Sequence, residues 1–522
     1  MRRALIVLFG TVVLAVALLL VGLQGLKTET ARRRIGVALS NALGQPVSLG
    51  RLSVTLLPTP ALMAGAIRIG NADSAGQPAI TAAALRVVPR LSSLLPGRGL
   101  SIAAADLDSL VITVRRDTVG RWLLPLPRRS PSDTARRAAI GLPELQFDHG
   151  AIRIYDERLR EEGGAHLTTI TDVAATVRAS DGRISASPLS GRLGTTTVSG
   201  AMLMRPDGAV IELKSESLQP ADVPAFLALM GVSSHPRISV AGRAPFQMKV
   251  VAAPRFASYV VTGNASAERM RVGDLDLEQV RTPFRLEQKT LTLNPIAFTA
   301  YGGRERGTVT VDLHRRPPRY TVRSSLVNLD VRRALTATTN VKNVLHGQAR
   351  VSGDLRGQGY GTTAVQKSLA GTVRFELTDG VIRGFPALAS IGRALGATAQ
   401  AGENTAFESL TGSATIAGGR ARTRDLVIRS GELLLAGEGT IGFDRTLDLR
   451  MVATLSAPLS QRLGGHLGLL NRLADDRGMI SLPLRVRGTA AAPRISVDVR
   501  AVAKQEFPDL VRRGLLELLQ RN

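Results

Sequence analysis

The side chains that could carry acid–base or metal chemistry are sparse and scattered in this chain. Its six histidines lie far apart in the sequence, and none forms an HxH or HExxH pair or stands within a cluster of carboxylates. No lysine follows a glycine, which excludes a phosphate-binding P-loop, and the sequence contains neither a GxSxG elbow nor an SxxK pair. These patterns predict a protein that is not an enzyme and that uses no metal and no cofactor.

One glycine motif fits a nucleotide-binding fingerprint. Residues 437–442 read GEGTIG, match GxGxxG, and follow a strand-like run. Dinucleotide binding requires a helix to begin at this point, so that its N-terminus holds the pyrophosphate, and an acidic residue about 20 positions later. Residues 443–449 instead alternate in hydrophobicity like another strand, and the acidic residue is missing. We therefore interpret these glycines as turn residues.

The formal net charge of +25 is typical of nucleic-acid-binding proteins, but its distribution argues against that class. Only 7 of the 67 basic residues are lysines, and the arginines are scattered singly along strand-like segments without alternating with aromatic residues. A basic exterior that faces anionic lipid headgroups is the functional alternative to simple coding bias. The chain has no cysteine, so an exported body must be stable without disulfides.

The first 26 residues predict a membrane anchor. Met1 and two arginines precede an uncharged run that begins at Ala4 and ends at Leu26, and about 20 apolar residues span a bilayer as a helix. The arginines should stay in the cytoplasm, which sends the remaining body across the membrane. The alternative is a cleaved signal peptide, because residues 15–17 resemble a cleavage site, but the apolar run continues beyond them.

From about residue 46, the period-two alternation of β-strands dominates. The alternating segments are bounded by Gly, Asp, Asn or Pro, which is typical of antiparallel strands joined by short turns. Because neighbouring residues of a strand point to opposite faces, Arg68, Arg374 and Asp448 should face away from the apolar side. The residues predicted for the apolar face are Ile67, Ile69, Ile152, Ile154, Val373, Phe375, Leu377, Leu447 and Leu449. Such a face must be covered, by closure into a barrel, by a second sheet, or by hydrocarbon held in an open trough.

Helical segments interrupt the strand pattern. An amphipathic helix is predicted over residues 29–43, and a final helix over residues 508–520 either caps a sheet or docks on a membrane or a partner. The Pro- and Arg-rich segment 125–139 is predicted to be a linker and the clearest domain boundary. Short helical inserts are predicted over residues 222–230, 386–395 and 460–473.

The chain resembles the AsmA family of envelope proteins over nearly its whole length. In the N-terminal part, the resemblance rests on IRIGNAD (67–73), LLPGRGLSI (94–102) and RRDTVGRW (115–122). In the C-terminal part, it rests on LAGTVRFELTDGVIRG (369–384) and LPLRVRGTAAAPRISVDV (482–499). Residues 160–320 are the weakest part of the resemblance.

The resemblance implies a mainly β fold: an N-terminal transmembrane helix, then a long antiparallel β-sheet curled into an open groove with an apolar interior and short helical inserts. It implies a single-pass protein of the Gram-negative inner membrane whose body lies in the periplasm and has no catalytic residues. The implied function is to bind and transfer phospholipid or lipopolysaccharide-type lipids in outer-membrane biogenesis and lipid homeostasis. The apolar-face residues named above are then the candidate lining of the lipid groove. The implied partners are membrane lipids and an envelope protein at the distal end, with no nucleic acid.

The alternative function is an assembly or scaffold factor that assists outer-membrane protein insertion, with its sheet edge pairing to client strands. The predicted domains are a cytoplasmic stub (1–3), the anchor (4–26), a chorein-like N-terminal region (27–124), the linker (125–139), a middle β-groove region (140–365), an AsmA-like C-terminal β region (366–500) and a C-terminal amphipathic helix (501–522).

Overall fold

The structure, a computed structural model, describes residues between 29 and 498, with gaps of which the longest are 71–77, 90–101, 124–143, 230–237, 392–403 and 465–474. The predicted anchor, the predicted linker and the predicted final helix all lie outside the described residues. Within the part that is described, no helix is both long and apolar enough to cross a membrane.

The chain forms two compact units. Unit 1 contains residues 1–233, 240–266 and 284–288, and unit 2 contains residues 234–239, 267–283 and 289–522. Both units are built mainly from β-strands, which confirms the mainly β fold class. Three strands, β13 (Ile238–Ala241), β15 (Tyr259–Val272) and β16 (Leu275–Glu287), contain residues of both units.

Unit 1 contains the first fourteen strands apart from β13. They are β1 (Val47–Ser48), β2 (Leu52–Thr55), β3 (Ala61–Ile69), β4 (Ile80–Pro89), β5 (Ile102–Asp108), β6 (Val111–Arg116), β7 (Trp122–Leu123), β8 (Glu144–Glu161), β9 (Gly164–Ser180), β10 (Arg183–Leu193), β11 (Thr196–Arg205), β12 (Gly208–Ser215) and β14 (Phe246–Ala252). From β8 onward, each strand pairs antiparallel with the next, through β9, β10, β11, β12 and β14 to the first half of β15.

The sheet of unit 1 is mixed, which corrects the prediction of a purely antiparallel sheet. β5 and β6 run in the same direction and pair in parallel with successive parts of β8, while both pair antiparallel with β4. They therefore act as one interrupted strand, broken where Ser109 has a φ of 53°. A parallel pair needs a long crossover connection, and residues 117–143 supply it. The predicted linker lies within this crossover, and the strands before and after it belong to the same unit.

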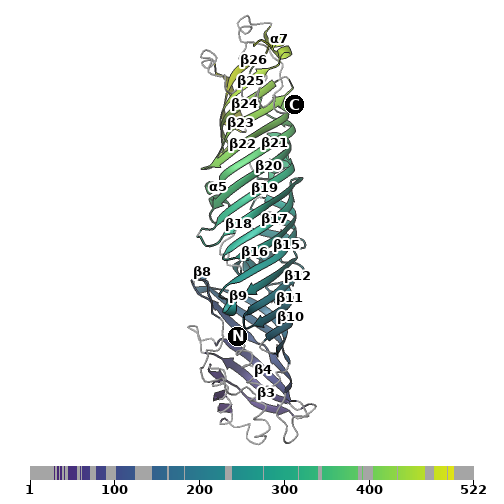
Figure 1. The fold of residues 1–522 in the computed structure, drawn as a ribbon, viewed down its shortest axis with the longest axis vertical. Helices are drawn as coiled ribbons and strands as arrows, with labels where there is room; N and C mark the ends of the chain where they lie inside the picture. Colours follow the sequence, from purple (N-terminus) through teal and green to yellow (C-terminus); the bar gives the residue numbers. More distant parts are fainter. Residues whose placement is uncertain are drawn as a thin grey trace. The chain divides into compact units, whose positions relative to one another are not determined.

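Unit 2 is a ladder of successive antiparallel strands (Figure 1). Its strands are β17 (Thr290–Ala300), β18 (Gly303–Asp312), β19 (Arg319–Asp330), β20 (Leu345–Gln358), β21 (Ala370–Ile382), β22 (Thr405–Ala417), β23 (Arg420–Ser430), β24 (Leu433–Gly442), β25 (Thr446–Leu455), β26 (Ile480–Thr489) and β27 (Ala492–Val497). Short turns join most of these strands, as the Gly- and Asp-rich boundaries predict.

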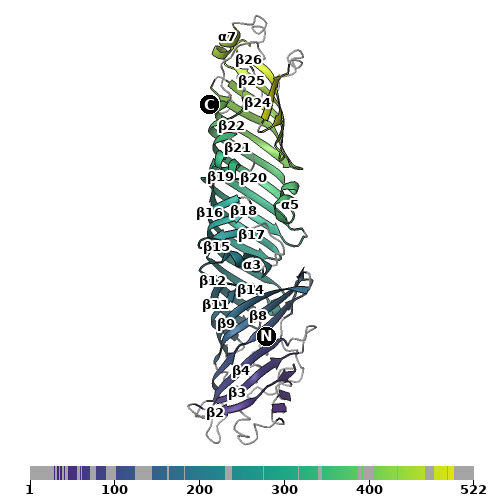
Figure 2. The ribbon, with the colours of Figure 1, turned by 180° about the vertical axis from the view of Figure 1, so that it is seen from behind.

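Short helices lie between the strands. In unit 1, α3 (Val223–Leu229, labelled in Figure 2) follows the short 3-10 helix η2 (Pro220–Asp222). It packs on β14, since the centres of the Phe226 and Phe246 rings are 5.0 Å apart. A second 3-10 helix, η3 (Pro254–Phe256), precedes β15. Unit 2 contains α4 (Val331–Thr338), α5 (Gly361–Ser368) and α7 (Ala457–Gly464).

The helix predictions are partly confirmed. α3 and α7 agree with two predicted inserts, and each described residue between 29 and 40 is helical. In the third predicted insert, Ala389 and Ile391 are described and both are helical. α4 and α5 were not predicted, because eight residues are shorter than the window over which a helical period is normally identified. In α4, the apolar residues Val331, Ala334 and Leu335 do recur at helical spacing.

Candidate functional site

The predicted alternation between the two faces of the strands is present. Ile67 and Ile69 are buried and Arg68 between them is exposed. Arg374 and Asp448 are also exposed, next to half-buried Phe375 and buried Leu449. The period-two pattern therefore sorts apolar and charged side chains to opposite faces, as the geometry of a strand requires.

The nine predicted lining residues do not share one environment. Ile67 and Ile69 belong to a packed hydrophobic cluster of unit 1, and Leu377 and Leu449 belong to a packed cluster of unit 2. The other five are half-buried: Ile152, Ile154, Val373, Phe375 and Leu447. Four of the candidates are thus covered by protein side chains.

The packed cluster of unit 2 is covered by helical segments. It joins the apolar faces of β20 to β26 with Val331 of α4, Leu459 of α7 and the helical residue Ile391, which is fully buried. A face that is closed in this way is a protein core, and its side chains are close-packed against one another.

A different apolar surface lies on β17 to β20, which we call the open apolar face. Two rows of directly paired residues cross these strands and point to the same side. All of the side chains are half-buried, and none is a member of either packed cluster. The open apolar face consists of Leu291, Leu293, Val309, Val311, Tyr320, Val322 and Leu355.

The opposite face of unit 2 is polar and charged. Thr321 and Arg323 alternate with Tyr320 and Val322 on β19, and both are exposed. Exposed ion pairs join neighbouring strands on this side, and each is worth little in stability. The pairs include Arg323–Asp354 at 2.9 Å, Arg350–Glu376 at 3.7 Å and Arg450–Glu438 at 3.7 Å.

One acidic residue lies on the apolar side of β18. Glu305 is buried, accepts a hydrogen bond from Ser324 Oγ at 2.9 Å, and accepts another from the Ser325 backbone N–H at 3.1 Å. Burial raises the pKa of Glu305, and these two hydrogen bonds oppose that shift only in part. Glu305 is therefore held closer to its neutral form than an exposed glutamate.

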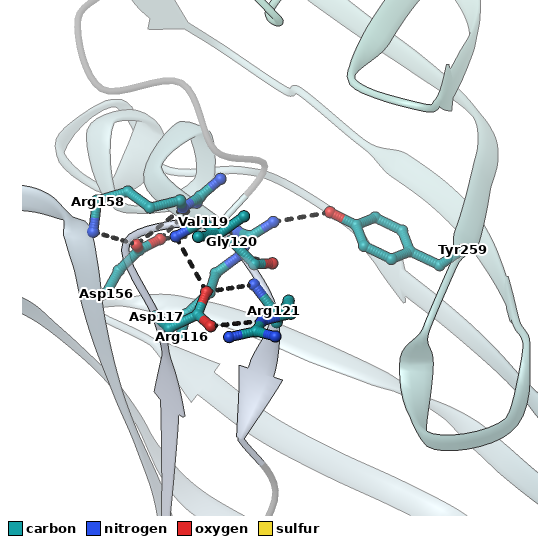
Figure 3. A network of polar contacts seen from close by, with 8 residues as sticks. All are labelled: Arg116, Asp117, Val119, Gly120, Arg121, Asp156, Arg158 and Tyr259. Carbon is teal, nitrogen blue, oxygen red and sulfur yellow. Dashed lines mark hydrogen bonds and ion pairs between the residues drawn. The ribbon is translucent and has the colours of Figure 1, made fainter.

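Unit 1 contains a buried polar cluster on its apolar side (Figure 3). We define the arginine cluster as Arg116, Asp156, Arg158, Tyr259 and Trp122. Arg116 follows Ile112 and Val114 at period two on β6 and is only 3% exposed. Its Nη2 donates to Tyr259 Oη at 2.8 Å, its Nε donates to the Gly120 carbonyl at 3.3 Å, and its Cζ lies 4.6 Å from the centre of the Trp122 ring.

Asp156 of β8 is shared by two arginines. Arg158 donates hydrogen bonds to the carboxylate from both its Nε and its Nη2, and its backbone N–H donates a third. Arg116 Nη1 is 3.7 Å from Asp156 Oδ2, which is an ion pair and not a hydrogen bond. Burial lowers the pKa of Arg116.

The turn that covers the cluster is fixed by Asp117. Its carboxylate accepts from the backbone N–H groups of Val119 and Arg121, at 3.0 and 2.8 Å, and from Arg121 Nε at 2.7 Å. Gly120 has a φ of 95°, a conformation that a non-glycine residue rarely adopts. This explains the spacing of RRDTVGRW: Asp and Gly form the turn, and the arginine before them points inward.

The contact between Arg116 and Tyr259 demonstrates that the sheet of unit 1 is bent. β6 and β15 are seven pairing steps apart, through β8, β9, β10, β11, β12 and β14. In a flat sheet, seven steps of about 4.8 Å would separate the two strands by roughly 34 Å. A 2.8 Å hydrogen bond between them requires strong curvature towards the apolar side.

The glycine motif at residues 437–442 is part of a strand, so the interpretation as turn residues is wrong for most of it. Gly437 and Gly439 lie inside β24, and a Cβ on Gly439 would come within 2.2 Å of the Asp448 carbonyl of β25. The glycines permit close approach of two strands, and no helix follows them. Among the described residues, no group of three or more acidic or histidine side chains could hold a metal ion.

These features define a class of protein built on long, successively paired strands with one apolar and one charged face. Residues 260–426 match the model of the AsmA family, and this match confirms the predicted resemblance to that family over this segment. The segment includes residues 260–320, which belong to the part where the sequence resemblance is weakest. The matched segment includes the whole open apolar face. No curated protein and no solved structure matches the chain. A match to this family is consistent with a role in lipid transport or envelope biogenesis.

Sequence reasoning missed the arginine cluster. RRDTVGRW was singled out as a hallmark of the family without a role for its residues. The available signal was the inward position of Arg116, because it follows Ile112 and Val114 at period two. Its partner Tyr259 lies 143 residues away, and no local pattern connects the two.

Proposed function

We propose that this protein binds the acyl chains of lipids along its open apolar face and transfers phospholipid or lipopolysaccharide-type lipids through the periplasm. In this proposal the chain is held in the inner membrane by residues 4–26, and an envelope protein receives the lipid at the distal end. The protein acts as a binding and transfer surface, not as an enzyme.

The half-burial of the open apolar face carries the proposal. Seven apolar side chains on four successive strands are neither exposed like a normal surface nor packed like a core. An apolar surface of this kind is favourable only when something apolar covers it. An acyl chain fits the requirement, because six of the seven side chains are Leu or Val and offer no hydrogen bonds, and the Tyr320 hydroxyl donates to the Gly359 carbonyl at 3.3 Å. Such a row accepts hydrocarbon of any length. The match to the AsmA family covers the same strands and supports the proposal.

The proposal is tested by placing a charge on the face. Val322 lies in the centre of the open apolar face, and its neighbour Thr321 is exposed on the opposite side of β19. In Val322→Glu, we expect the fold to survive, because a half-buried carboxylate can remain hydrated. Lipid binding would remove water from the introduced carboxylate of this variant, and a desolvation cost of only about 1.4 kcal/mol would lower the lipid affinity tenfold.

The readout is native mass spectrometry of the full chain, purified in mild detergent, with the bound lipids identified after release. Thr321→Glu is the matched control, because it adds the same charge one residue away on the other face, opposite Arg356. A photo-crosslinking side chain at position 322 should label lipid, and one at position 321 should not. Equal lipid content and equal labelling in both variants would exclude the open apolar face as the binding surface.

The alternative, a scaffold that captures client strands, predicts a different result. If the protein stably captures unfolded outer-membrane proteins, and Val322→Glu does not change that capture, client strands pair at a sheet edge and lipids do not bind on the open apolar face.

A further inference from the structure

We propose that the arginine cluster of unit 1 is an oxyanion site that recognises the phosphate of a lipid headgroup. This inference deepens the proposed function and rests on it, because it names the polar end of the molecule whose acyl chains the protein would bind.

The charge balance around the site is the first observation. Four arginines lie at or next to the site, and all but Arg116 are paired with a carboxylate of their own. Arg121 pairs with Asp117, Arg115 pairs with Glu157 at 3.9 Å, and Arg158 pairs with Asp156. Arg116 shares Asp156 only at 3.7 Å. Four guanidinium groups and three carboxylates leave one positive charge, and that charge lies on the most deeply buried arginine.

The second observation is an incomplete donor set. Arg116 Nη1 is buried and has no hydrogen-bond partner among the described residues. Asp156 does not supply one, because its nearest oxygen, Oδ2, lies 3.7 Å from Arg116 Nη1, which is too far for a hydrogen bond. A buried guanidinium with an unused N–H and no carboxylate of its own is costly unless an anion completes it.

The geometry favours a tetrahedral oxyanion. A planar guanidinium presents paired donors that match phosphate oxygens, and Arg158 stands beside Arg116 on the same carboxylate. The exposed turn of residues 117–121 covers the guanidinium, and its Gly120 carbonyl accepts the longest of the Arg116 hydrogen bonds, at 3.3 Å. An oxyanion that displaces this carbonyl replaces a neutral acceptor with a charged one.

The surroundings favour an amphiphile over a free ion. Val114 and Ile154 lie two residues before Arg116 and Asp156 on the same side of β6 and β8, and they pair in register. Val114 is buried and Ile154 is half-buried, so a phosphate at Arg116 has apolar side chains directly beside it, and the first carbons of an acyl chain can lie against Ile154.

The test compares two lipids with the same acyl chains, phosphatidylglycerol and diacylglycerol, bound to the full chain in detergent. We expect the wild type to prefer phosphatidylglycerol, and Arg116→Lys to reduce that preference about tenfold, because lysine keeps the charge but loses the paired donors. Binding of diacylglycerol should not change. Arg205→Gln is the control, since it removes an exposed arginine of β11 that belongs neither to the arginine cluster nor to the turn that covers it.

Competition by inorganic phosphate provides a measurement that needs no variant. It should displace phosphatidylglycerol from the wild type and leave diacylglycerol bound. A folded Arg116→Lys variant with unchanged preference, together with no competition by phosphate, would overturn the site while leaving the proposed function intact. Binding of phosphate without any lipid preference would assign the cluster to a free oxyanion and overturn the headgroup assignment. If neither lipid binds but phosphate still protects the wild type from thermal unfolding, the proposed function fails and the headgroup assignment fails with it.

Discussion

At the scale of single residues, two inward-facing charged groups have opposite environments. Arg116 in unit 1 is one of several charged groups joined by ion pairs, whereas Glu305 in unit 2 accepts hydrogen bonds from Ser324 Oγ and the Ser325 backbone N–H. Burial lowers the pKa of the first. The second is moved by burial towards its neutral form.

Glu305 makes stability depend on pH in a defined direction. Its pKa is raised in the folded state, so its contribution is fully present below the unfolded pKa of about 4.3 and is lost as pH rises through the folded pKa. Glu305→Gln keeps an acceptor for Ser324 and cannot ionise. We therefore expect the variant to gain stability relative to the wild type as pH rises from 4 to 7, measured by urea unfolding. Glu408→Gln, at an exposed position of β22, should show no such trend. A wild-type advantage that grows with pH would contradict this reading of Glu305.

At the scale of elements, glycines permit aromatic rings to lie across neighbouring strands. Phe407 of β22 lies over its register partner Gly380 of β21, and Phe375 lies over its register partner Gly412. A ring over a cross-strand glycine shields the backbone that a missing side chain leaves bare. Both pairs border the packed cluster of unit 2.

We expect Gly380→Ala to destabilise the protein by about 1–3 kcal/mol through overpacking. A Cβ at this position would lie 2.1 Å from Phe407 Cζ and 2.4 Å from the His346 carbonyl, and the carbonyl cannot move without disturbing the sheet. Gly65→Ala is the control, because its new Cβ would meet nothing closer than 3.8 Å. Chemical denaturation of the two variants measures the difference, and equal stability would show that β21 and β22 separate easily.

The distinction between packed and half-buried positions gives a second prediction for the elements. Leu449→Asp places a carboxylate in a packed cluster, and we expect a loss of roughly 4 kcal/mol or more. Phe375→Glu is half-buried, so its carboxylate can reach water and the loss should be smaller. Thermal unfolding followed by circular dichroism distinguishes the two. Comparable collapse of both variants would mean that the face around Phe375 is closed like the core.

The strands were largely predictable from the sequence, and their pairing across long distances was not. Period-two alternation around Ile67, Phe375 and Leu449 identifies both the element and its faces, because that signal is local. The parallel pairing of β6 with β8 depends on a crossover of more than twenty residues, and no local pattern reports it. The sequence also did not predict which parts of the apolar face are packed and which are half-buried, because this depends on which helices cover which strands.

At the scale of the whole molecule, the proposal that residues 4–26 hold the body at the membrane can be tested directly. We expect a reporter that is active only outside the cytoplasm, fused after Asn522, to be active. The full chain should sediment with membranes after a carbonate wash, and a variant that lacks residues 4–26 should not. A shortened soluble form that begins near Leu18 would show instead that the N-terminal segment is a cleaved signal.

The hydrogen bond between Arg116 and Tyr259 has a consequence for how the chain folds as it is made. In unit 2, strands that are neighbours in the chain are also neighbours in the sheet, and most are joined by short connections. Each new strand can therefore add to the previous one, and the ladder can grow in the order of synthesis. Unit 1 cannot be completed in this way, because Arg116 must wait for a residue 143 positions later. Until Tyr259 emerges, a charged guanidinium remains on the apolar side of an unfinished sheet, where it disfavours premature collapse and association with other chains. The first strands of unit 1 are thus made early but are completed only after Tyr259, 143 residues beyond Arg116, has been synthesised.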